Sequence, residues 1–449
     1  MEYDLVSLGT QVLRDAERFG AQHAEVFLTS RKEIKLNVEK GAMKVAKEKH
    51  DVGCAIRAVI DKRLGSSFTS TFDELDLRKR AENAVSLANV SLPDEKFQSF
   101  PESKGSYSPV DGLFDPQLAN LDSDEAVNLL MRTVEACRTH LPNMRVLIEA
   151  SLTVQSIETA ILNSLGIKGS YQETLIDLSA DPTIKVEDGQ ASSFEFQIAR
   201  DLKQINPEKI GECAAKNTLS LLRPKPVRSG TLPILFTPVA LDFIFRIGFV
   251  NAFNAEEVQM GRSYLGDYLN EVIAPEYFTL RDAGLLPKGN RSRPFDSEGF
   301  PSQNTEIISE GHLQNFYHNS YTANKTNTEN TGNASRASYR DPLKIAPTNI
   351  IITPGKGSYD ELLEEMGKGL ICRLTFDKPN IGTGEFSALI MEGYYVEKGE
   401  IQHPVKNTLI GINMRDFFKG IQLVGADTRT IHTAITPSLV IESAKISSN

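Results

Sequence analysis

The chain has 449 residues and a formal net charge of −10. This length exceeds what one hydrophobic core normally serves, so about two to four domains are expected. The acidic balance argues against direct binding of DNA or RNA phosphates, because such binding needs a clustered basic surface. We therefore expect no nucleic-acid partner.

Cysteine placement and the apolar runs indicate the compartment. The four cysteines are far apart and form no Cys-x-x-Cys pair, which is typical of reduced, mostly buried thiols. No basic region followed by an apolar core opens the chain, so no signal peptide is expected. The longest apolar stretch, residues 241–253, is interrupted by charged side chains and is too short to span a bilayer. These features predict a cytoplasmic protein with no membrane partner.

Residues 1–95 show the pattern of a small α+β unit. Apolar residues recur at helical spacing over 5–19, and alternation over 34–38 and 52–60 predicts strands. The Thr and Glu at the two ends of 71–74 have the spacing of a capping box, which predicts the start of a second helix there.

A similar order of elements follows a linker. Residues 96–121 are rich in Pro, Ser, Gly and Asp, as linkers often are. In residues 122–226, Asp122 is placed to cap a helix, extended segments follow, and Asn206-Pro207 can open a closing helix. We interpret the two units as a degenerate internal duplication of a helix–strands–helix pattern.

The character changes in residues 227–449. Short apolar strands alternate with many Gly, Asn and Thr turns, and an almost wholly hydrophobic helix follows the first strand. This composition predicts a large β-rich, barrel-like C-terminal domain. The predicted fold class is α+β: two small duplicated units followed by this domain.

Residues 292–299 contain two acids, Asp296 and Glu298, two positions apart and close to Arg293. In an extended strand both acids would point to one face and can serve as general acid and base. The pair fits a polar turn equally well, and the turn is favoured because no histidine lies beside it.

Two further polar segments are candidate loops. Asn333 belongs to a glycine-containing loop, residues 330–336, which can present backbone N–H groups to an anion or a peptide carboxylate. Gly384 and Glu385 lie in 382–387, which lacks the Lys-Ser/Thr of a phosphate-binding loop. A plain surface loop is the alternative. Together with Arg293, Asp296 and Glu298, these residues are our candidates for peptide-binding or assembly loops.

Several ordered motifs resemble those of the TldD/PmbA family. Residues 292–299 resemble its Ser-Arg-Pro-Phe-Asp-x-Glu-Gly signature, and further matches occur at 163–166, 261–263 and 382–411. The TldD branch carries a zinc motif, His-Glu-x-x-x-His. The corresponding stretch here, 245–250, reads Phe-Arg-Ile-Gly-Phe-Val. These side chains supply neither imidazole ligands nor a carboxylate base for zinc chemistry. The resemblance therefore implies the PmbA (TldE) type of subunit, and it assigns no catalytic or metal-binding residue to this chain.

The resemblance also implies a function. The family forms a TldD–TldE complex that degrades or trims flexible peptides, and its members have also been described as modulators of DNA gyrase. We expect a non-catalytic subunit of a cytoplasmic zinc metallopeptidase, with the zinc in a TldD-like partner and no cofactor in this chain. The expected partners are that paralogue and unfolded peptides, with a homodimer as the alternative for the isolated chain. The alternative functions are a gyrase-modulating binding protein without a protease role and a self-sufficient, metal-independent hydrolase.

Overall fold

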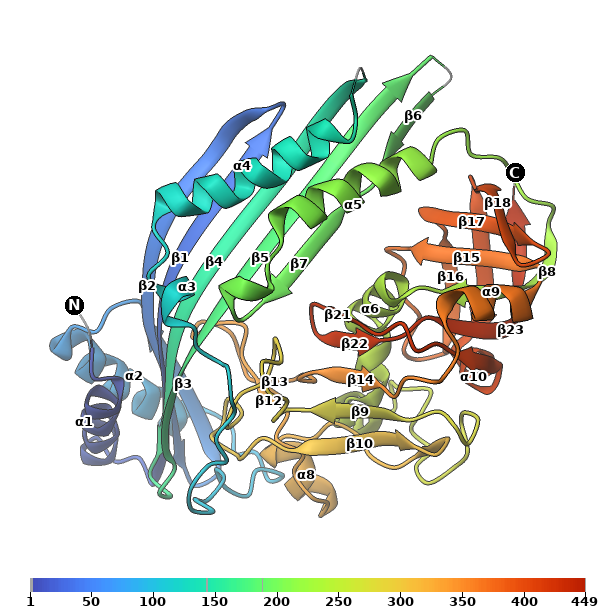
Figure 1. Cartoon of the computed structure of the whole chain (residues 1–449). Coiled ribbons are helices and arrows are strands. Elements are labelled where there is room, and N and C mark those ends of the chain that lie inside the picture. Colours follow the sequence, from blue (N-terminus) through green and yellow to red (C-terminus); the bar gives the residue numbers. More distant parts are fainter. Residues whose placement is uncertain (1–2, 143, 188, 449) are drawn as a thin grey trace.

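A computed structural model describes residues 3–142, 144–187 and 189–448. The chain is a mixed α/β fold that is rich in strands and has few helices. One long, twisted sheet forms its N-terminal part, and shorter sheets form its C-terminal part (Figure 1).

The two predicted N-terminal units share one sheet. Its strand order is β3-β2-β1-β4-β5-β6, with β7 paired to β5, and all neighbours are antiparallel. The strands are β1 (His23–Glu39), β2 (Ala42–Ile60), β3 (Arg63–Thr69), β4 (Arg145–Asn163), β5 (Lys168–Val186), β6 (Gly189–Ser192) and β7 (Glu195–Ala199). Strand β1 of the first unit pairs with β4 of the second, from Glu25–Asn163 to Val38–Ala150. The order of elements is as predicted, and the two units meet along this central pair.

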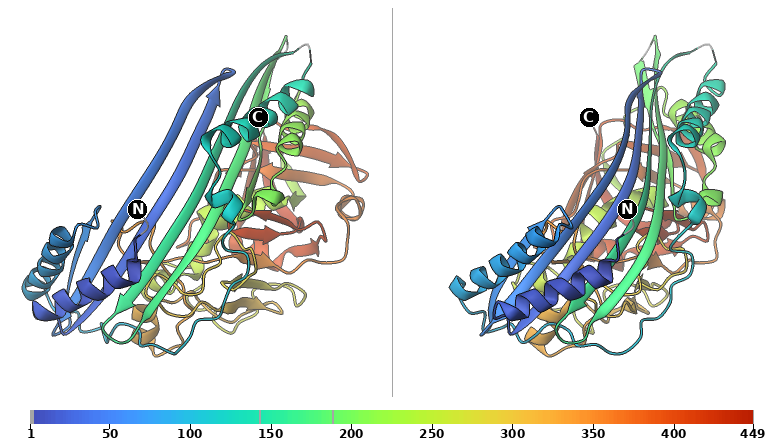
Figure 2. Two further views of the ribbon diagram at one scale, coloured as in Figure 1. Left: turned by 60° about the vertical axis from the view of Figure 1, so that its left-hand side comes forward. Right: turned by 90° about the vertical axis from the view of Figure 1, so that its left-hand side faces the viewer.

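Four helices cover one face of this sheet. They are α1 (Leu5–Arg18), α2 (Glu74–Val90), α4 (Ser123–Thr139) and α5 (Pro207–Ser220). On β1, Leu28 packs in the cluster beneath α1 and α2, whereas Leu36 packs beneath α4 and α5. Alternate residues of a strand share a face, so the two helix pairs cover opposite ends of the same face (Figure 2).

Side-chain caps fix where these helices begin. Asp122 caps α4 as predicted and forms a capping box with Glu125, and Asn206 caps α5. The predicted start of α2 at residue 71 is wrong. Asp73 is the cap, because its carboxylate accepts the Asp76 amide at 3.0 Å.

The opposite face of the sheet rests on the C-terminal domain. Phe27, Ala55 and Ile161 pack with Phe295 and Tyr339. The predicted linker also packs here. It contains the short helix α3 (Pro116–Ala119) and buried phenylalanines, and its Tyr107 ring lies 4.5 Å from that of Phe295. Both parts of the molecule therefore share a small apolar cluster.

The C-terminal domain contains two larger open sheets and one two-stranded sheet, β12-β13. The orders of the larger two are β16-β19-β23-β8-β15-β17-β18, with β20 on β23, and β11-β10-β9-β14-β22-β21. The strand bounds are β8 (Gly230–Phe236), β9 (Leu280–Ala283), β10 (Asn304–Ser309), β11 (His312–Leu313), β12 (Ala334–Ser335), β13 (Lys344–Ile345), β14 (Ile350–Ile352), β15 (Gly369–Leu374), β16 (Glu385–Leu389), β17 (Glu392–Glu397), β18 (Glu400–Pro404), β19 (Thr408–Asn413), β20 (Ile421–Val424), β21 (Arg429–Ile431), β22 (Ala434–Thr436) and β23 (Leu439–Ser448).

The barrel-like arrangement is not confirmed, because neither larger sheet closes on itself in the part of the chain that is described. Helix α6 (Pro238–Ile247) contacts strands of both sheets, and the main core joins side chains from both. The apolar segment therefore fills the space between two open sheets.

The remaining helices are short. They are η1 (Leu202–Gln204), η2 (Phe249–Phe253), α7 (Ala255–Gln259), α8 (Ser320–Thr326), α9 (Tyr359–Met366) and α10 (Met414–Lys419). Throughout residues 3–142, 144–187 and 189–448, every helix lacks the combination of length and apolar character that crossing a membrane requires.

Candidate functional site

Four of the six candidate residues lie in loops beneath the long sheet. Arg293, Asp296 and Glu298 follow β9, and Asn333 immediately precedes β12. Asp296, Glu298 and Asn333 are buried, and Arg293 is half-buried.

Asp296 organises a tight turn. Its Oδ1 accepts the backbone amides of Glu298 at 2.9 Å and Phe300 at 3.0 Å, and its Oδ2 accepts that of Ala334 at 3.0 Å. Arg293 donates to the Ala334 carbonyl at 2.9 Å. Burial, and then the nearby Glu298 carboxylate, raise the pKa of Asp296. The segment is thus a polar turn whose acid orders the backbone.

Glu298 belongs to a buried ion-pair network that we call the sheet–loop joint, formed by Glu25, Arg57, Glu298 and Arg336. Arg57 Nη2 lies 2.6 Å from Glu25 Oε2 and 3.3 Å from Glu298 Oε1. Arg336 Nη2 lies 3.0 Å from Glu25 Oε1. The second oxygen of Glu298 accepts the Ser320 amide at 3.0 Å. The joint therefore ties β1 and β2 to loops of the C-terminal domain.

The charges of the joint balance one another. Burial alone would lower the pKa of Arg57, but Glu25 and Glu298 outweigh it and raise that pKa. Burial, followed by the neighbouring Arg57, lowers the pKa of Arg336, whereas Glu25 opposes this shift. Two guanidinium groups shared by two carboxylates make a structural contact, with both acids engaged.

Asn333 is a crosslink between loops. Its Nδ2 donates to Asp282 Oδ2 at 2.6 Å, and its Oδ1 accepts the Thr331 hydroxyl at 2.6 Å. Asp282 Oδ1 accepts both the amide and the hydroxyl of Thr348, at 2.7 and 2.8 Å. Burial raises the pKa of Asp282 to about 6. Asn333 therefore holds a buried carboxylate in place.

Gly384 and Glu385 lie in a different turn. The Gly384 amide donates to the Asn380 carbonyl at 2.8 Å, and a φ of +78° suits glycine at this position. Glu385 is exposed at the start of β16. The structure brings Arg293, Asp296, Glu298 and Asn333 into one set of loops and leaves these two residues outside it.

The stretch that corresponds to the zinc motif is a hydrophobic core. Phe245 in α6 and Val250 in η2 are buried. The Phe249 ring lies 5.0 Å from that of Phe245, 4.9 Å from Phe253 and 4.6 Å from Phe418. These residues do not fit a zinc ion, which needs imidazole, thiolate or carboxylate ligands. Within the described ranges, with gaps at 143 and 188, no three His, Cys, Asp or Glu side chains gather closely enough to hold a metal ion.

One polar cluster on α6 was missed by sequence reasoning. Asp242 is fully buried, and its Oδ2 lies 2.9 Å from His432 Nδ1 and 3.1 Å from Arg246 Nε. Its Oδ1 has no hydrogen-bond partner among the described residues. His432 lies in the turn between β21 and β22, with a φ of +32°. A single carboxylate among the apolar residues at 238–245 is the signal that could have indicated a partner, because buried charges are normally paired.

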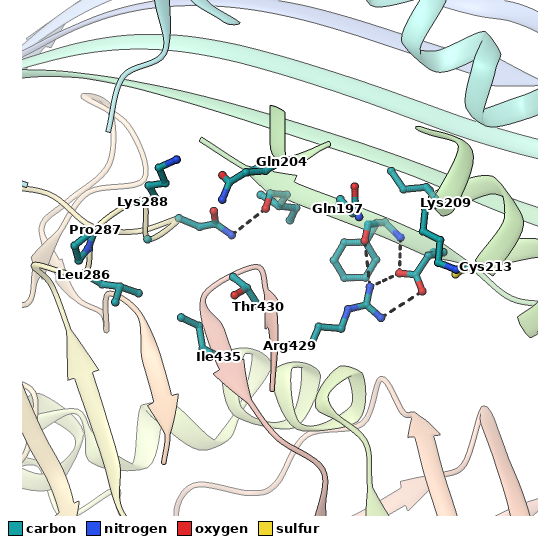
Figure 3. Close-up of a pocket in the computed structure, with 17 residues that line it drawn as sticks. Gln197, Gln204, Lys209, Cys213, Leu286, Pro287, Lys288, Arg429, Thr430 and Ile435 are labelled. Atoms are coloured by element: carbon teal, nitrogen blue, oxygen red, sulfur yellow. Dashed lines mark hydrogen bonds and ion pairs between the residues drawn. The ribbon is translucent and has the colours of Figure 1, made fainter. Parts of the chain in front are cut away.

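A cavity of about 590 Å³ runs beside β7 (Figure 3). Its walls come from β7, α5, the loop at 286–290 and the β21–β22 hairpin. Arg429 pairs with Glu195 in it and donates to the Phe196 carbonyl at 3.2 Å. Lys288 pairs with Asp201 at 3.2 Å. Arg429 and Lys288 are therefore both engaged in ion pairs.

Comparison with known proteins covers nearly the whole chain. Residues 24–88 match PmbA/TldA metallopeptidase domain 1, residues 116–222 match the central domain, and residues 229–448 match the C-terminal domain of the same family. A metalloprotease PmbA homolog from Haemophilus influenzae is 26% identical over 99% of this chain and 98% of its own length. The metalloprotease PmbA of Escherichia coli O157:H7 is 26% identical over 94% and 92%.

Solved structures of similar fold include proteins with related names. A Thermotoga maritima protein named as a candidate modulator of a DNA gyrase has a TM-score of 0.89 and 27% identity, with 99% of this chain and 100% of that chain covered. TldE from Thermococcus kodakarensis shares the fold, with a TM-score of 0.91, 23% identity and coverage of 98% and 100%. The chain belongs to the PmbA/TldD metallopeptidase family.

Proposed function

We propose that this chain is a non-catalytic subunit of a cytoplasmic zinc metallopeptidase complex that degrades or trims flexible peptides. A TldD-like paralogue would supply the zinc and the catalytic base. The observation that carries the proposal is the aromatic packing of Phe245, Phe249 and Phe253 where zinc chemistry would need polar ligands.

The buried acids support the same division of labour. Asp296 accepts backbone amides, Glu298 pairs with Arg57, and Asp282 is held by Asn333 and Thr348. A general base must reach the proton that it abstracts. These three acids are enclosed and engaged in structural contacts, so none of them is placed to act as a general base toward a bound peptide.

The direct test is reconstitution. The chain is co-expressed with the zinc-bearing paralogue of its own genome, and cleavage of an unfolded peptide is measured for each chain alone and for the mixture. We expect cleavage by the mixture, its loss on adding a chelator, and no cleavage by this chain. Cleavage by this chain alone would support an independent hydrolase. Gyrase binding without peptide cleavage by the mixture would support the binding-protein alternative.

Variants in the candidate loops distinguish a role in binding or assembly from a catalytic role. Gly384→Glu should impair the complex by spoiling binding or assembly, and Gly382→Glu at an exposed neighbouring position is its control. Asn333→Lys replaces a fully buried crosslink with a cation, so it should destabilise the fold of this chain itself. Asp296→Asn should alter turnover far less once assembly is intact. A loss of several orders of magnitude in that variant, with assembly preserved, would place a catalytic carboxylate in this chain.

A further inference from the structure

Strand β3 is the outermost strand at one edge of the long sheet, and α2 lies beside it (Figure 1). A turn of two residues, 61–62, joins it to β2, and their φ values are +48° and +63°. In a hairpin of this kind, the flanking residues Ile60 and Arg63 form a hydrogen-bonded pair. Hydrogen-bonded and non-hydrogen-bonded pairs then alternate, and the register between β2 and β3 has no shift. Ser66 and Phe68 therefore direct their backbone N–H and C=O groups away from β2.

An extended segment of the chain already covers the first part of this outward edge. Pro93 forms an antiparallel bridge with Arg63, and the amide that follows Pro93 donates to the Lys62 carbonyl at 2.9 Å. Further along the strand, the outward groups of Ser66 and Phe68 make no hydrogen bond to any residue that the structure describes. The edge thus pairs with an extended backbone at one end and, among the described residues, lacks a strand partner at the other.

A groove of about 670 Å³ runs along this free part of the edge. It is lined by the consecutive residues 66–70 and by Arg80, Asn83, Ser86 and Leu87 of α2. Side chains of a strand alternate between its two faces, so a hollow that touches consecutive residues lies against the edge of the strand. Four of the lining residues are serines, whose small side chains leave the backbone of β3 accessible.

Contacts at both ends of the groove fix the distance between α2 and β3. Gly65 lies so close to the helix that an added Cβ would overlap the Ala84 carbonyl oxygen. The Thr69 hydroxyl donates to the Asp76 carboxylate near the start of the helix. The groove therefore has walls that are already in place before a ligand binds, which lowers the entropic cost of binding.

The chemistry of the groove favours recognition of a backbone. Of the nine described residues that line it, only Arg80 is charged, and Asp76 already pairs with Arg80 at 3.2 Å. Phe68 and Leu87 are 49% and 47% exposed, so they offer apolar surface beside the unpaired backbone groups. A complementary ligand supplies backbone donors and acceptors together with apolar, uncharged side chains.

We propose that the groove between β3 and α2 binds an extended, uncharged segment of a flexible peptide as an added strand. The segment pairs with the outward backbone groups of Ser66 and Phe68, and its apolar side chains cover Phe68 and Leu87. Pairing of this kind tolerates many sequences, because every residue except Pro carries the same backbone donor and acceptor. The inference rests on the proposed peptide-handling function and adds a docking site in the N-terminal sheet of this subunit.

The test measures peptide affinity for the purified full chain by fluorescence anisotropy. One labelled probe is a hexapeptide of alternating Thr and Val, which favour extended backbone, and the other is the same peptide N-methylated at every residue. N-methylation removes the donors that would pair with the carbonyls of Ser66 and Phe68. We expect the methylated peptide to bind about tenfold more weakly, because two backbone hydrogen bonds are lost.

Three variants assign the binding to the groove, and the thermal midpoint of each shows whether it folds. Ser86→Trp fills the groove from an exposed position, so the affinity for the unmethylated peptide should fall to that for the methylated one. Glu82→Trp is the matched control, because Glu82 is exposed on the same helix and does not line the groove, and it should preserve the difference. Ser66→Pro removes one outward N–H and leaves the pairing with β2 intact, so it should weaken both peptides.

Equal affinities of the two peptides for the unmodified chain, or no binding of either, would overturn the groove as a peptide site. So would a difference that survives in Ser86→Trp. A chain that is dimeric in gel filtration, binds neither peptide and becomes monomeric in Ser86→Trp would show that a second copy covers the edge instead.

The outcomes for the groove and for the proposed function are separable. Normal cleavage by the mixture with the zinc-bearing paralogue, without peptide binding to this chain, would leave the proposed function standing and overturn the groove. Peptide binding that depends on the groove, without cleavage by that mixture, would support the groove and overturn the proposed function.

Discussion

The segment α6–η2 and the sheet–loop joint are both buried, but the first is apolar and the second is charged. In α6–η2, Phe245, Phe249 and Phe253 pack edge to face in a core. In the joint, Glu25, Arg57, Glu298 and Arg336 are buried as a network of ion pairs. A zinc metallopeptidase would need polar ligands in α6–η2. The buried polar groups lie instead in the sheet–loop joint, where they hold two parts of the molecule together.

The contrast teaches that buried charge alone does not indicate chemistry. Asp296 has a raised pKa, as catalytic acids often do, but its oxygens accept three backbone amides. A perturbed pKa with every oxygen engaged in structure is the mark of a fixed turn. The cluster of Asp242, Arg246 and His432 differs, because one Asp242 carboxylate oxygen and the Nη atoms of Arg246 have no hydrogen-bond partner among the residues that the structure describes.

Substitution in the aromatic core of α6–η2 should cause the largest loss of stability. Phe249→Ala removes a fully buried ring that contacts four others, so the free energy of unfolding should fall by about 3–5 kcal/mol. Urea denaturation followed by circular dichroism measures this change. Phe376→Ala, at a ring that is 53% exposed, is the control and should cost less than about 1 kcal/mol. Similar losses for both variants would show that α6–η2 is not a packed core.

The second largest loss of stability is expected in the sheet–loop joint. Glu298→Gln keeps an oxygen for the Ser320 amide but removes the charge that faces Arg57, so we expect a loss of about 2–3 kcal/mol. The control is Glu208→Gln, whose pair with Arg132 is exposed and should contribute less than about 1 kcal/mol. Equal shifts of the unfolding midpoint in the two variants would contradict a structural role for the joint.

A pH effect of at most about 2–3 kcal/mol is expected from Asp282, because its pKa of about 6 exceeds its ordinary value of 3.8. The folded protein keeps a proton that the unfolded chain releases between about pH 4 and 6, so stability falls as pH rises through this window. Asp282→Asn should lose this dependence, whereas Asp267→Asn at an exposed site should keep it. Parallel stability–pH curves for the wild type and Asp282→Asn would refute the assignment.

The smallest effect concerns a turn outside both regions. Gly384→Ala places a side chain at a φ of +78°, which should cost about 1 kcal/mol. Gly382→Ala is the control, because the nearest atom to its added Cβ, Asn380 Oδ1, is at 3.4 Å, and the residue is not among those with positive φ. The thermal midpoints of the two variants should differ in this order, and the reverse order would exclude backbone strain as the cause.

Local features were predictable from the sequence, and long-range pairings were not. The capping box at Asp122 and Glu125 and the cap at Asn206 follow from neighbours in sequence, and the structure has both. The pairing of β1 with β4 joins segments more than a hundred residues apart, so alternation within each strand cannot specify it. The barrel-like closure was also not confirmed, because short alternating strands fit an open sheet as well as a closed one.

In the candidate site, too, local contacts were predictable from the sequence and long-range contacts were not. The turn at Asp296 was predictable from its local sequence, since its Oδ1 accepts the backbone amides of residues only two and four positions further on. The contact between His432 and Asp242 spans 190 residues, and that between Glu25 and Arg336 spans 311. No spacing rule connects such distant residues, so these clusters emerged only from the folded chain.

Zinc stoichiometry tests the central claim most directly. The chain and its complex with the zinc-bearing paralogue are each purified by gel filtration, and bound metal is quantified by mass spectrometry. The account predicts no stoichiometric zinc on this chain alone and about one zinc per complex, carried by the paralogue. About one tightly bound zinc per isolated chain would contradict a non-catalytic subunit.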